Sequence, residues 1–181
     1  METTKNALPD HIKLFFKELR DYLDTKILYF GSVQRGDYFP GTSDIDVDIF
    51  SDNENSIMVK MQHFLHVKKT KFKKFVWKLN HNNTLAYGHK IMYKNENEDN
   101  PQLGFNVEFS IYNEKYKQGI LHEHLKKTVL PFYATWMLII LKILHYNLYL
   151  LPEKPFKYLK KKVLTFGIGL PDDQFVVLDA K

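Results

Sequence analysis

The first part of the chain alternates short apolar runs with segments rich in glycine, proline and polar residues. Between residues 9 and 24, apolar residues recur every three or four positions, which is typical of an amphipathic helix. Residues 26–30 are almost all apolar and end at Gly31, so they predict a short buried strand. The following segment to residue 43 holds further glycines and a proline, which predicts a loop with one helical turn.

Residues 44–50, DIDVDIF, alternate acidic and apolar side chains with a period of two. This period predicts a strand whose carboxylates all point to one face of a sheet. Carboxylates on one face repel one another, so a positively charged ligand is expected beside them.

Two helices and a hairpin are predicted after this strand. Residues 57–65 carry apolar residues at helical spacing, after a polar turn. Residues 67–79 place apolar residues among six lysines, which favours a second, basic amphipathic helix. Residues 85–95 and 103–113 predict two strands that form a β-hairpin around a polar loop.

The remainder is predicted to be helical from about Glu114 to Gly167, with breaks at Pro152 and Pro155. The longest apolar stretch, residues 130–152, is nearly long enough to span a bilayer. Charged and polar residues interrupt it, which favours a buried helix of a soluble domain over a membrane span. The N-terminal residues lack a signal-peptide pattern, so we expect an intracellular, cytoplasmic protein that does not act at a membrane.

The amino-acid composition excludes some kinds of site and suggests others. The chain has no cysteine, which excludes disulfides, thiolate metal sites and cysteine nucleophiles. Residues 1–60 hold 7 Lys or Arg against 11 Asp or Glu, whereas residues 61–181 hold 19 against 10. An acidic pole on a basic body suits a site for cations and for a polyphosphate or nucleic-acid partner. A solvated surface of a lysine-rich protein explains the same charges equally well.

The order of strand, Gly-Ser, loop and acid-x-acid strand suits metal-dependent phosphoryl or nucleotidyl transfer. Such chemistry uses Mg²⁺ held by carboxylates to neutralise charge on a phosphate. Asp44 and Asp46 are two positions apart on one strand face, roughly 7 Å along the chain, and can share a metal pair. Gly31 and Ser32 offer backbone N–H groups and a hydroxyl to phosphate oxygens.

The joined stretch FGS…SDIDV resembles the signature of the DNA polymerase β-like nucleotidyltransferase superfamily. The segment GSVQRGDYFPGTSDID is also similar to the minimal nucleotidyltransferases. The resemblance implies an α/β (α+β) nucleotidyltransferase core, a small mixed β-sheet with helices packed on one side, plus a short helical C-terminal part. Residues 1–113 are then the catalytic core and residues 114–181 a helical extension packed on it.

The resemblance also implies a metal site for Mg²⁺ or Mn²⁺ formed by Asp44, Asp46 and Glu108. Glu108 occupies an apolar strand similar to the hairpin strand of poly(A) polymerase-like members that carries the third carboxylate. The alternative is an edge strand that shows Glu108 to water. Asp48 has three interpretations: a further ligand, a base near the acceptor hydroxyl, or a solvent-exposed strand end.

Four residues are candidates for binding the nucleotide. Gly31 and Ser32 would bind the β- and γ-phosphates. Arg35 would contact the triphosphate, or is a solvated loop arginine. Lys142 lies in a helix similar to the Leu-Lys helix of poly(A) polymerase-like enzymes, where the lysine approaches the phosphates; otherwise its stem packs along an apolar helix.

The implied reaction transfers a nucleoside monophosphate from a nucleoside triphosphate to an acceptor hydroxyl and releases pyrophosphate. Lysine runs interleaved with aromatic residues, KKTKFKKF and KPFKYLKKK, favour an RNA or DNA 3′ end as the acceptor. Two alternatives stay open: a minimal nucleotidyltransferase that modifies a protein or small molecule by AMPylation-type chemistry, and a catalytically inactive module that binds nucleotides or nucleic acid. The pair of histidines in His122-Glu123-His124 is too closely spaced for a zinc site on one helix face.

Overall fold

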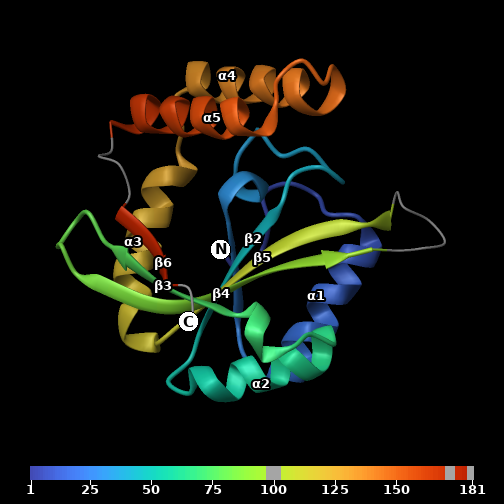
Figure 1. Cartoon of the computed structure of the whole chain (residues 1–181), viewed down its shortest axis with the longest axis vertical. Coiled ribbons are helices and arrows are strands. Elements are labelled where there is room, and N and C mark those ends of the chain that lie inside the picture. The colour runs from blue at the N-terminus through green and yellow to red at the C-terminus, as the bar shows by residue number, and fades with distance from the viewer. Residues whose placement is uncertain (97–102, 170–173, 179–181) are drawn as a thin grey trace.

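The alternation of acidic and apolar residues forms strand β2 (Ile45–Phe50), second in a sheet of order β1-β2-β5-β4-β3-β6. The computed structural model describes residues 1–96, 103–169 and 174–178 (Figure 1). The other strands are β1 (Ile27–Phe30), β3 (Lys73–Lys78), β4 (Leu85–Asn95), β5 (Phe105–Tyr112) and β6 (Gln174–Leu178). The α-helices are α1 (Asp10–Leu23), α2 (Glu54–Leu65), α3 (Lys117–Thr128), α4 (Phe132–Lys142) and α5 (Glu153–Ile168). Shorter helical turns are η1 (Gly31–Gln34), η2 (Lys69–Lys71), η4 (Glu114–Tyr116) and η5 (Ile143–Asn147).

The sheet is mixed. Strand β2 runs parallel to β5 and places Asp46 beside Glu108, whereas the other paired strands are antiparallel. Strands β4 and β5 form the predicted hairpin, and the loop between them at 97–102 lies outside the described residues. Because β5 lies between β2 and β4, the alternative of an edge strand is wrong.

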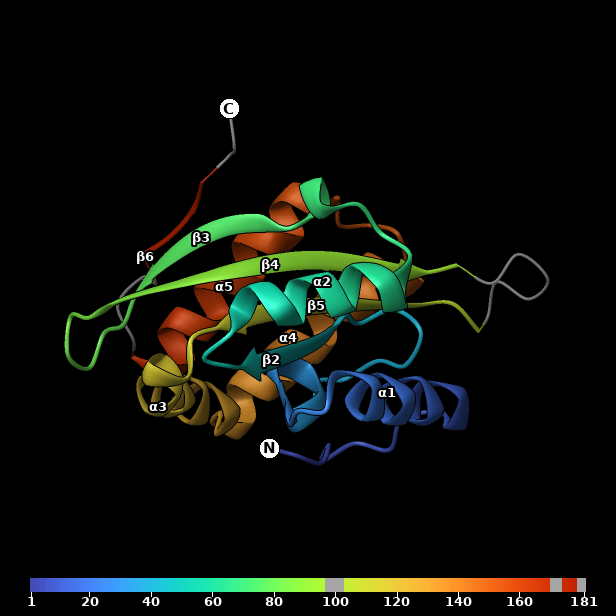
Figure 2. The same ribbon diagram turned by 90° about the horizontal axis from the view of Figure 1, so that it is seen from below.

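Helices cover both faces of the sheet, not one face as expected (Figures 1 and 2). The odd-numbered residues of β2 and β5 pack with α1 and α2 in the main core. The opposite face carries its own apolar cluster, which includes Phe75 and Trp77, and α3 covers it through Ile120. Apolar side chains on both faces of the strands require cover on both sides, and that explains the second layer.

The predicted basic helix over 67–79 is wrong. This segment forms the short turn η2 and then strand β3, which pairs with β4 on one side and β6 on the other. Phe75 and Trp77 are 1% and 3% exposed and alternate with outward residues. Apolar residues at 72, 75, 76 and 79 also fit a helix, so the sequence is compatible with both a helical and an extended period. Pairing with the neighbouring strands β4 and β6 favours the extended form.

The C-terminal part is helical as predicted, but it also returns to the sheet. Helices α4 and α5 lie side by side beyond one end of the sheet, and β6 then pairs with β3 (Figure 1). Pro152 precedes α5, whereas Pro155 lies in its first turn, where its missing N–H costs no helical hydrogen bond.

Helix α4 is buried along one side only, whereas the sequence predicted a buried helix. Ala134, Leu138 and Lys142 are buried, while Phe132 and Trp136 are 78% and 63% exposed. In the described part of the chain, no single helix has the length and apolar character to cross a membrane. One pair, 114–128 with 132–147, satisfies those criteria only when joined, and it is bent by 83°.

Candidate active site

Two carboxylates stand side by side where β2 and β5 run parallel. Asp46 and Glu108 are directly opposite in register, so their side chains share the sheet face that α3 covers in part. Burial, together with the negative charges of Glu108 and Asp44, raises the pKa of Asp46 to about 7. The pair therefore carries unfavourable negative charge that a cation would relieve.

Gly31 closes over Asp46 from the start of η1. Its φ is +67°, a conformation that side chains rarely adopt, and a Cβ placed there would lie 1.8 Å from Oδ2 of Asp46. The glycine predicted as a phosphate binder thus also makes room for the carboxylate. The next residue, Ser32, is buried, and its carbonyl accepts a hydrogen bond from the Arg35 N–H at 2.9 Å.

Asp44 lies at the mouth of this site, just before β2 begins, and is exposed. In the parts of the chain that the structure describes, no three His, Cys, Asp or Glu side chains are arranged to hold a metal ion. The donors nevertheless suit a hard divalent cation, since carboxylate oxygens are the ligands that Mg²⁺ prefers. Asp46 and Glu108, with Asp44 beside them, are the residues that could hold it.

Asp48 is 1% exposed, so its interpretation as a solvent-exposed strand end is wrong. The Nε2 atom of His124 on α3 lies 2.8 Å from Oδ2 of Asp48, although the angles are not those of a hydrogen bond. Burial raises the pKa of Asp48, and His124 opposes that rise. The His124 ring is stacked on Phe30 with centroids 3.9 Å apart and lies 5.3 Å from the Trp77 ring.

A cavity of about 250 Å³ opens beside Glu108. Its lining residues come from β1, β3, β4, β5 and α3: Phe30, Trp77, Lys90, Glu108, Ser110, Tyr112, His124 and Lys127. Lys90 Nζ lies 3.8 Å from Glu108 Oε2, and Lys127 Nζ lies 4.8 Å from the centre of the Trp77 ring. One carboxylate of the site thus forms part of a wall that otherwise contains aromatic and basic groups.

The two basic residues predicted to bind the nucleotide are buried around Asp37. Arg35 donates from Nε and Nη2 to the Asp37 carboxylate at 2.8 and 3.3 Å, and Lys142 Nζ lies 3.2 Å from Oδ2. Lys142 also donates to the carbonyl of Asp37 and, at 2.9 Å, to Oγ of Ser43. The three charged side chains are at most 7% exposed. Lys142 therefore ties α4 to the loop between β1 and β2.

Burial and the neighbouring charges together set the pKa values of Asp37 and Lys142. Burial alone would raise the pKa of Asp37, but Arg35 and Lys142 hold it below its ordinary value. Burial lowers the pKa of Lys142 to about 8, against the attraction of Asp37. From the other side of the loop, the Asn6 amide donates to the carbonyls of Val33 and Arg35 at 3.0 and 2.6 Å. The loop that carries Gly31 is thus fixed from two directions.

Lys160 places positive charge near the carboxylate of Asp46. The positive charges of Lys160, on α5, and of Arg35 both lower the pKa of Asp46, against the effect of burial. Lys157 on the same helix has its pKa raised chiefly by Glu153 and to a smaller extent by Asp44. Helix α5 therefore places positive charge over the acidic site.

Sequence reasoning missed Asp37, His124, Lys90 and Lys160. Asp37 and its partner Lys142 are 105 positions apart in the sequence. Asp48 and His124 come together only when α3 packs on the sheet. The one local signal was Asp37 itself, an acid two residues after an arginine in a loop.

Comparison with known proteins gives a family and distant structural neighbours. The sequence profile of the nucleotidyltransferase domain matches residues 10–131, more than half of the chain. No curated protein sequence matches significantly. Cid1 poly(U) polymerase with bound MgGTP shares 18% identity and a TM-score of 0.44, over 74% of this chain and 39% of that one. A complex of Cid1 with the UTP analogue UMPNPP shares 18% identity and a TM-score of 0.37, over 74% and 37%. The chain thus spans less than half of these neighbours.

Proposed function

The chain belongs to the nucleotidyltransferase domain family, and from that membership we propose that it transfers a nucleoside monophosphate from a nucleoside triphosphate to an acceptor hydroxyl, with release of pyrophosphate. The acceptor we propose is a nucleic-acid 3′ end. The observation that carries the proposal is the register pair Asp46 and Glu108, with Gly31 leaving space for the Asp46 carboxylate.

We propose that Asp44, Asp46 and Glu108 hold Mg²⁺ or Mn²⁺. When bound, the metal neutralises triphosphate charge and lowers the pKa of the attacking hydroxyl. The raised pKa of Asp46 supports this proposal, because repulsion between carboxylates is the condition that a divalent cation relieves.

For the triphosphate, we propose Gly31 and Ser32, as the sequence predicts, together with Lys160, whereas Arg35, held by Asp37, is proposed to position the loop that carries Gly31. Support comes from the position of η1 next to Asp46 and from the effect of the Lys160 charge on that carboxylate. We propose that Lys142 acts as a positioning residue, since its ammonium group is held by Asp37 and Ser43. Replacing Lys160 by Gln should weaken binding of a fluorescent nucleoside triphosphate, whereas Lys162→Gln, an exposed residue of the same helix, should not.

The test incubates the protein with Mn²⁺ or Mg²⁺ and each α-labelled nucleoside triphosphate in turn. Acceptors are a short RNA, a short DNA and total cell protein, and Asp44→Ala serves as the variant. Label on RNA or DNA that is lost in the variant is the expected result. Label on protein alone would establish the protein-modifying alternative. No transfer from a folded sample that binds oligonucleotide would establish the inactive binding module.

A further inference from the structure

Positive charge and aromatic surface gather on the face of the sheet that carries Glu108, around the cavity that Glu108 lines and on the strands β4 and β3 beyond it. Three lysines form this group, here called the face lysines: Lys73 on β3, Lys90 on β4 and Lys127 on α3. Lys90 contacts Glu108 at 3.8 Å, and Lys127 lies beside the cavity that Glu108 also lines.

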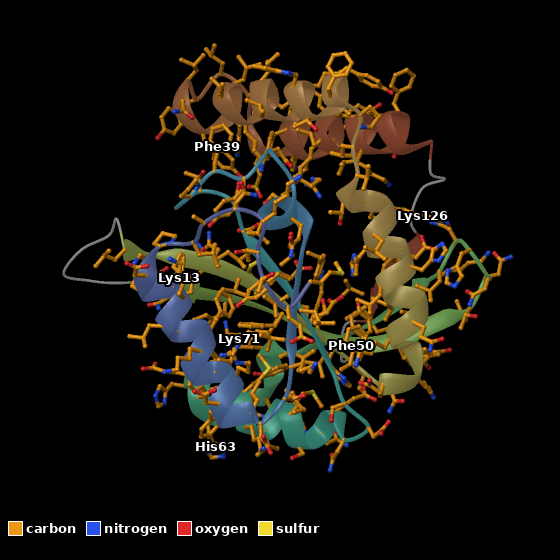
Figure 3. The ribbon with its side chains drawn as sticks, turned by 180° about the vertical axis from the view of Figure 1, so that it is seen from behind. Lys13, Phe39, Phe50, His63, Lys71 and Lys126 are labelled. Atoms are coloured by element: carbon orange, nitrogen blue, oxygen red, sulfur yellow. The ribbon has the colours of Figure 1, made fainter. Side chains whose placement is uncertain are left out.

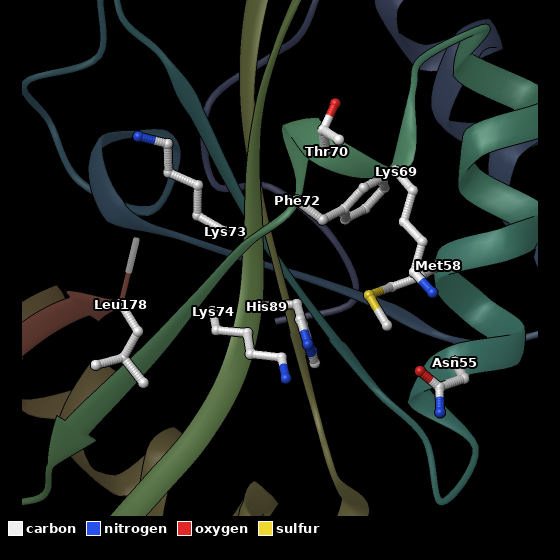
Figure 4. Close-up of a pocket in the computed structure, with 9 residues that line it drawn as sticks. All are labelled: Asn55, Met58, Lys69, Thr70, Phe72, Lys73, Lys74, His89 and Leu178. Atoms are coloured by element: carbon white, nitrogen blue, oxygen red, sulfur yellow. The ribbon is translucent and has the colours of Figure 1, made fainter. Parts of the chain in front are cut away.

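Lys73 extends this group by one strand. It is directly opposite Lys90 in the antiparallel β3–β4 register, so both side chains emerge on one face. Neighbouring strands are about 4.8 Å apart, so Lys90 and Lys73 lie one and two strand spacings away from β5, which carries Glu108. Its sequence neighbour Lys74 is opposite His89, which lies 3.7 Å from Glu54 on α2, and therefore belongs to the other face. Figure 4 shows Lys73 and Lys74 pointing to opposite sides of the strand.

The cavity between Glu108 and Lys127 suits a flat ring that is linked to an anion. Phe30 and Trp77 contribute aromatic surface, and the indole Nε1 of Trp77 is buried without a hydrogen-bond partner. Stacking on aromatic side chains and phosphate contacts from lysines are the two ways in which proteins bind single-stranded nucleic acid. Lysines alone would fit any polyanion, but aromatic walls next to a catalytic carboxylate favour a nucleoside with its phosphates.

We propose that the 3′ end of a single-stranded polynucleotide acceptor binds here, with its terminal nucleoside in the cavity and its phosphates on the face lysines. This proposal rests on the proposed function, because it places the attacking 3′ hydroxyl beside Glu108. It assigns the acceptor to the cavity beside Glu108 and to the neighbouring strands β4 and β3. Of the lysines in η2 and β3, the proposal assigns Lys73 alone to the acceptor.

Two adjacent lysine pairs provide matched controls. Lys73→Gln and Lys127→Gln remove charge from the catalytic face, whereas Lys74→Gln and Lys126→Gln remove the same charge one residue away. Lys126 is exposed on the outer side of α3 (Figure 3). All four variants carry the same net charge, so long-range attraction is equal among them.

The experiment measures binding of a fluorescent ten-nucleotide RNA, and of the same DNA sequence, by anisotropy over a range of salt concentrations. We expect Lys73→Gln and Lys127→Gln each to weaken binding and to lower the slope of log affinity against log salt by about 0.7, the value for one phosphate contact on a single strand. Lys74→Gln and Lys126→Gln should keep the wild-type slope. Equal losses in all four variants, or no binding at low salt, would overturn the proposal. The RNA and DNA arms identify which polymer binds more tightly.

Crosslinking supplies the register. An oligonucleotide with a photoreactive base at its 3′ end should attach to peptides that contain Phe30 or Lys127, and attachment confined to α2 or η2 would contradict the proposal. Binding is measured without nucleotide, so it is separable from transfer. If Asp46→Asn and the wild type both fail to transfer label, the proposed function is wrong even where the four lysine variants behave as expected.

Discussion

The buried triad of Arg35, Asp37 and Lys142 provides a quantitative test of how the loop is held. Asp37 is fully buried and contacts both cations within 3.3 Å. Changing it to Asn removes the one negative charge between two buried positive charges. Breaking a buried ion pair in this way costs about 3–5 kcal/mol. The free energy of unfolding of Asp37→Asn should fall by this amount at pH 7, a large share of a typical stability of about 5–15 kcal/mol.

Lys142→Met is the companion variant. It leaves Arg35 and Asp37 as a neutral pair, so the free energy of unfolding should fall less than in Asp37→Asn. In the Lys142→Met background, Asp37→Asn should cost at least about 1 kcal/mol less than in the wild type, a coupling typical of residues in direct contact.

The assay is equilibrium unfolding in urea. With a slope near 2 kcal/mol per M, the loss for Asp37→Asn corresponds to a midpoint lower by roughly 2 M. Asp52→Asn, the same change at an exposed turn, should stay within about 0.5 kcal/mol of the wild type. An Asp37→Asn loss as small as that of Asp52→Asn would refute the triad as a buried structural element.

The pH dependence gives a second readout for the triad. The pKa of Lys142 in the folded protein is about 8 against an ordinary 10.5, so the unfolded chain binds more protons over this window. Stability from this group therefore rises as the pH increases from about 8 to 10.5. Without Asp37 the pKa of Lys142 falls further, and Asp37→Asn should recover part of its stability from lower pH onward. Lys142→Met should abolish this recovery.

Three further changes test the site. Gly31→Ala should lower stability in urea more than Gly41→Ala, since both glycines have positive φ but only at Gly31 does the new Cβ meet Asp46; equal losses would contradict the close approach. Because the pKa of Asp46 is raised from 3.8 to about 7, its burial costs metal-free stability progressively as pH rises through that window, and Mn²⁺ affinity by calorimetry should be weaker at pH 6 than at pH 8. This pH dependence of the metal-free stability should vanish in Asp46→Asn. His124→Phe keeps an aromatic ring in place but removes the imidazole nitrogen that lies 2.8 Å from the buried Asp48, so the free energy of unfolding should fall by about 1–3 kcal/mol, and Asp48→Asn in that background should restore part of it.

The parts of the fold that follow from local periodicity were predictable. The helix at α1, the strand β2 and the β4–β5 hairpin each show one clear period in the sequence, and the structure confirms them. Strand β3 was not predictable, because its apolar residues satisfy both a helical and an extended period and its partners are distant in sequence. Strand β6 depends on the same long-range pairing.

The site was predictable where its chemistry is local. The order of strand, Gly-Ser and acid-x-acid strand assigned Gly31 and Asp46 to one site, and their roles there stay predictions. In the structure Gly31 approaches Asp46, and Glu108 lies beside Asp46 because β2 and β5 run parallel. The environment of Lys142 was not predictable, since an ammonium group that binds phosphate and one that binds a buried carboxylate look alike in the sequence. Only the packing of α4 against the loop distinguishes them.

We propose that Asp46 and Glu108 form a metal-dependent transfer site. The most direct measurement compares transfer of an α-labelled nucleotide to an oligonucleotide by the wild type, Asp46→Asn and Asp52→Asn, with Mn²⁺ and with the metal chelated. We expect metal-dependent transfer by the wild type and by Asp52→Asn, and no transfer by a folded Asp46→Asn. Undiminished transfer by Asp46→Asn would contradict it.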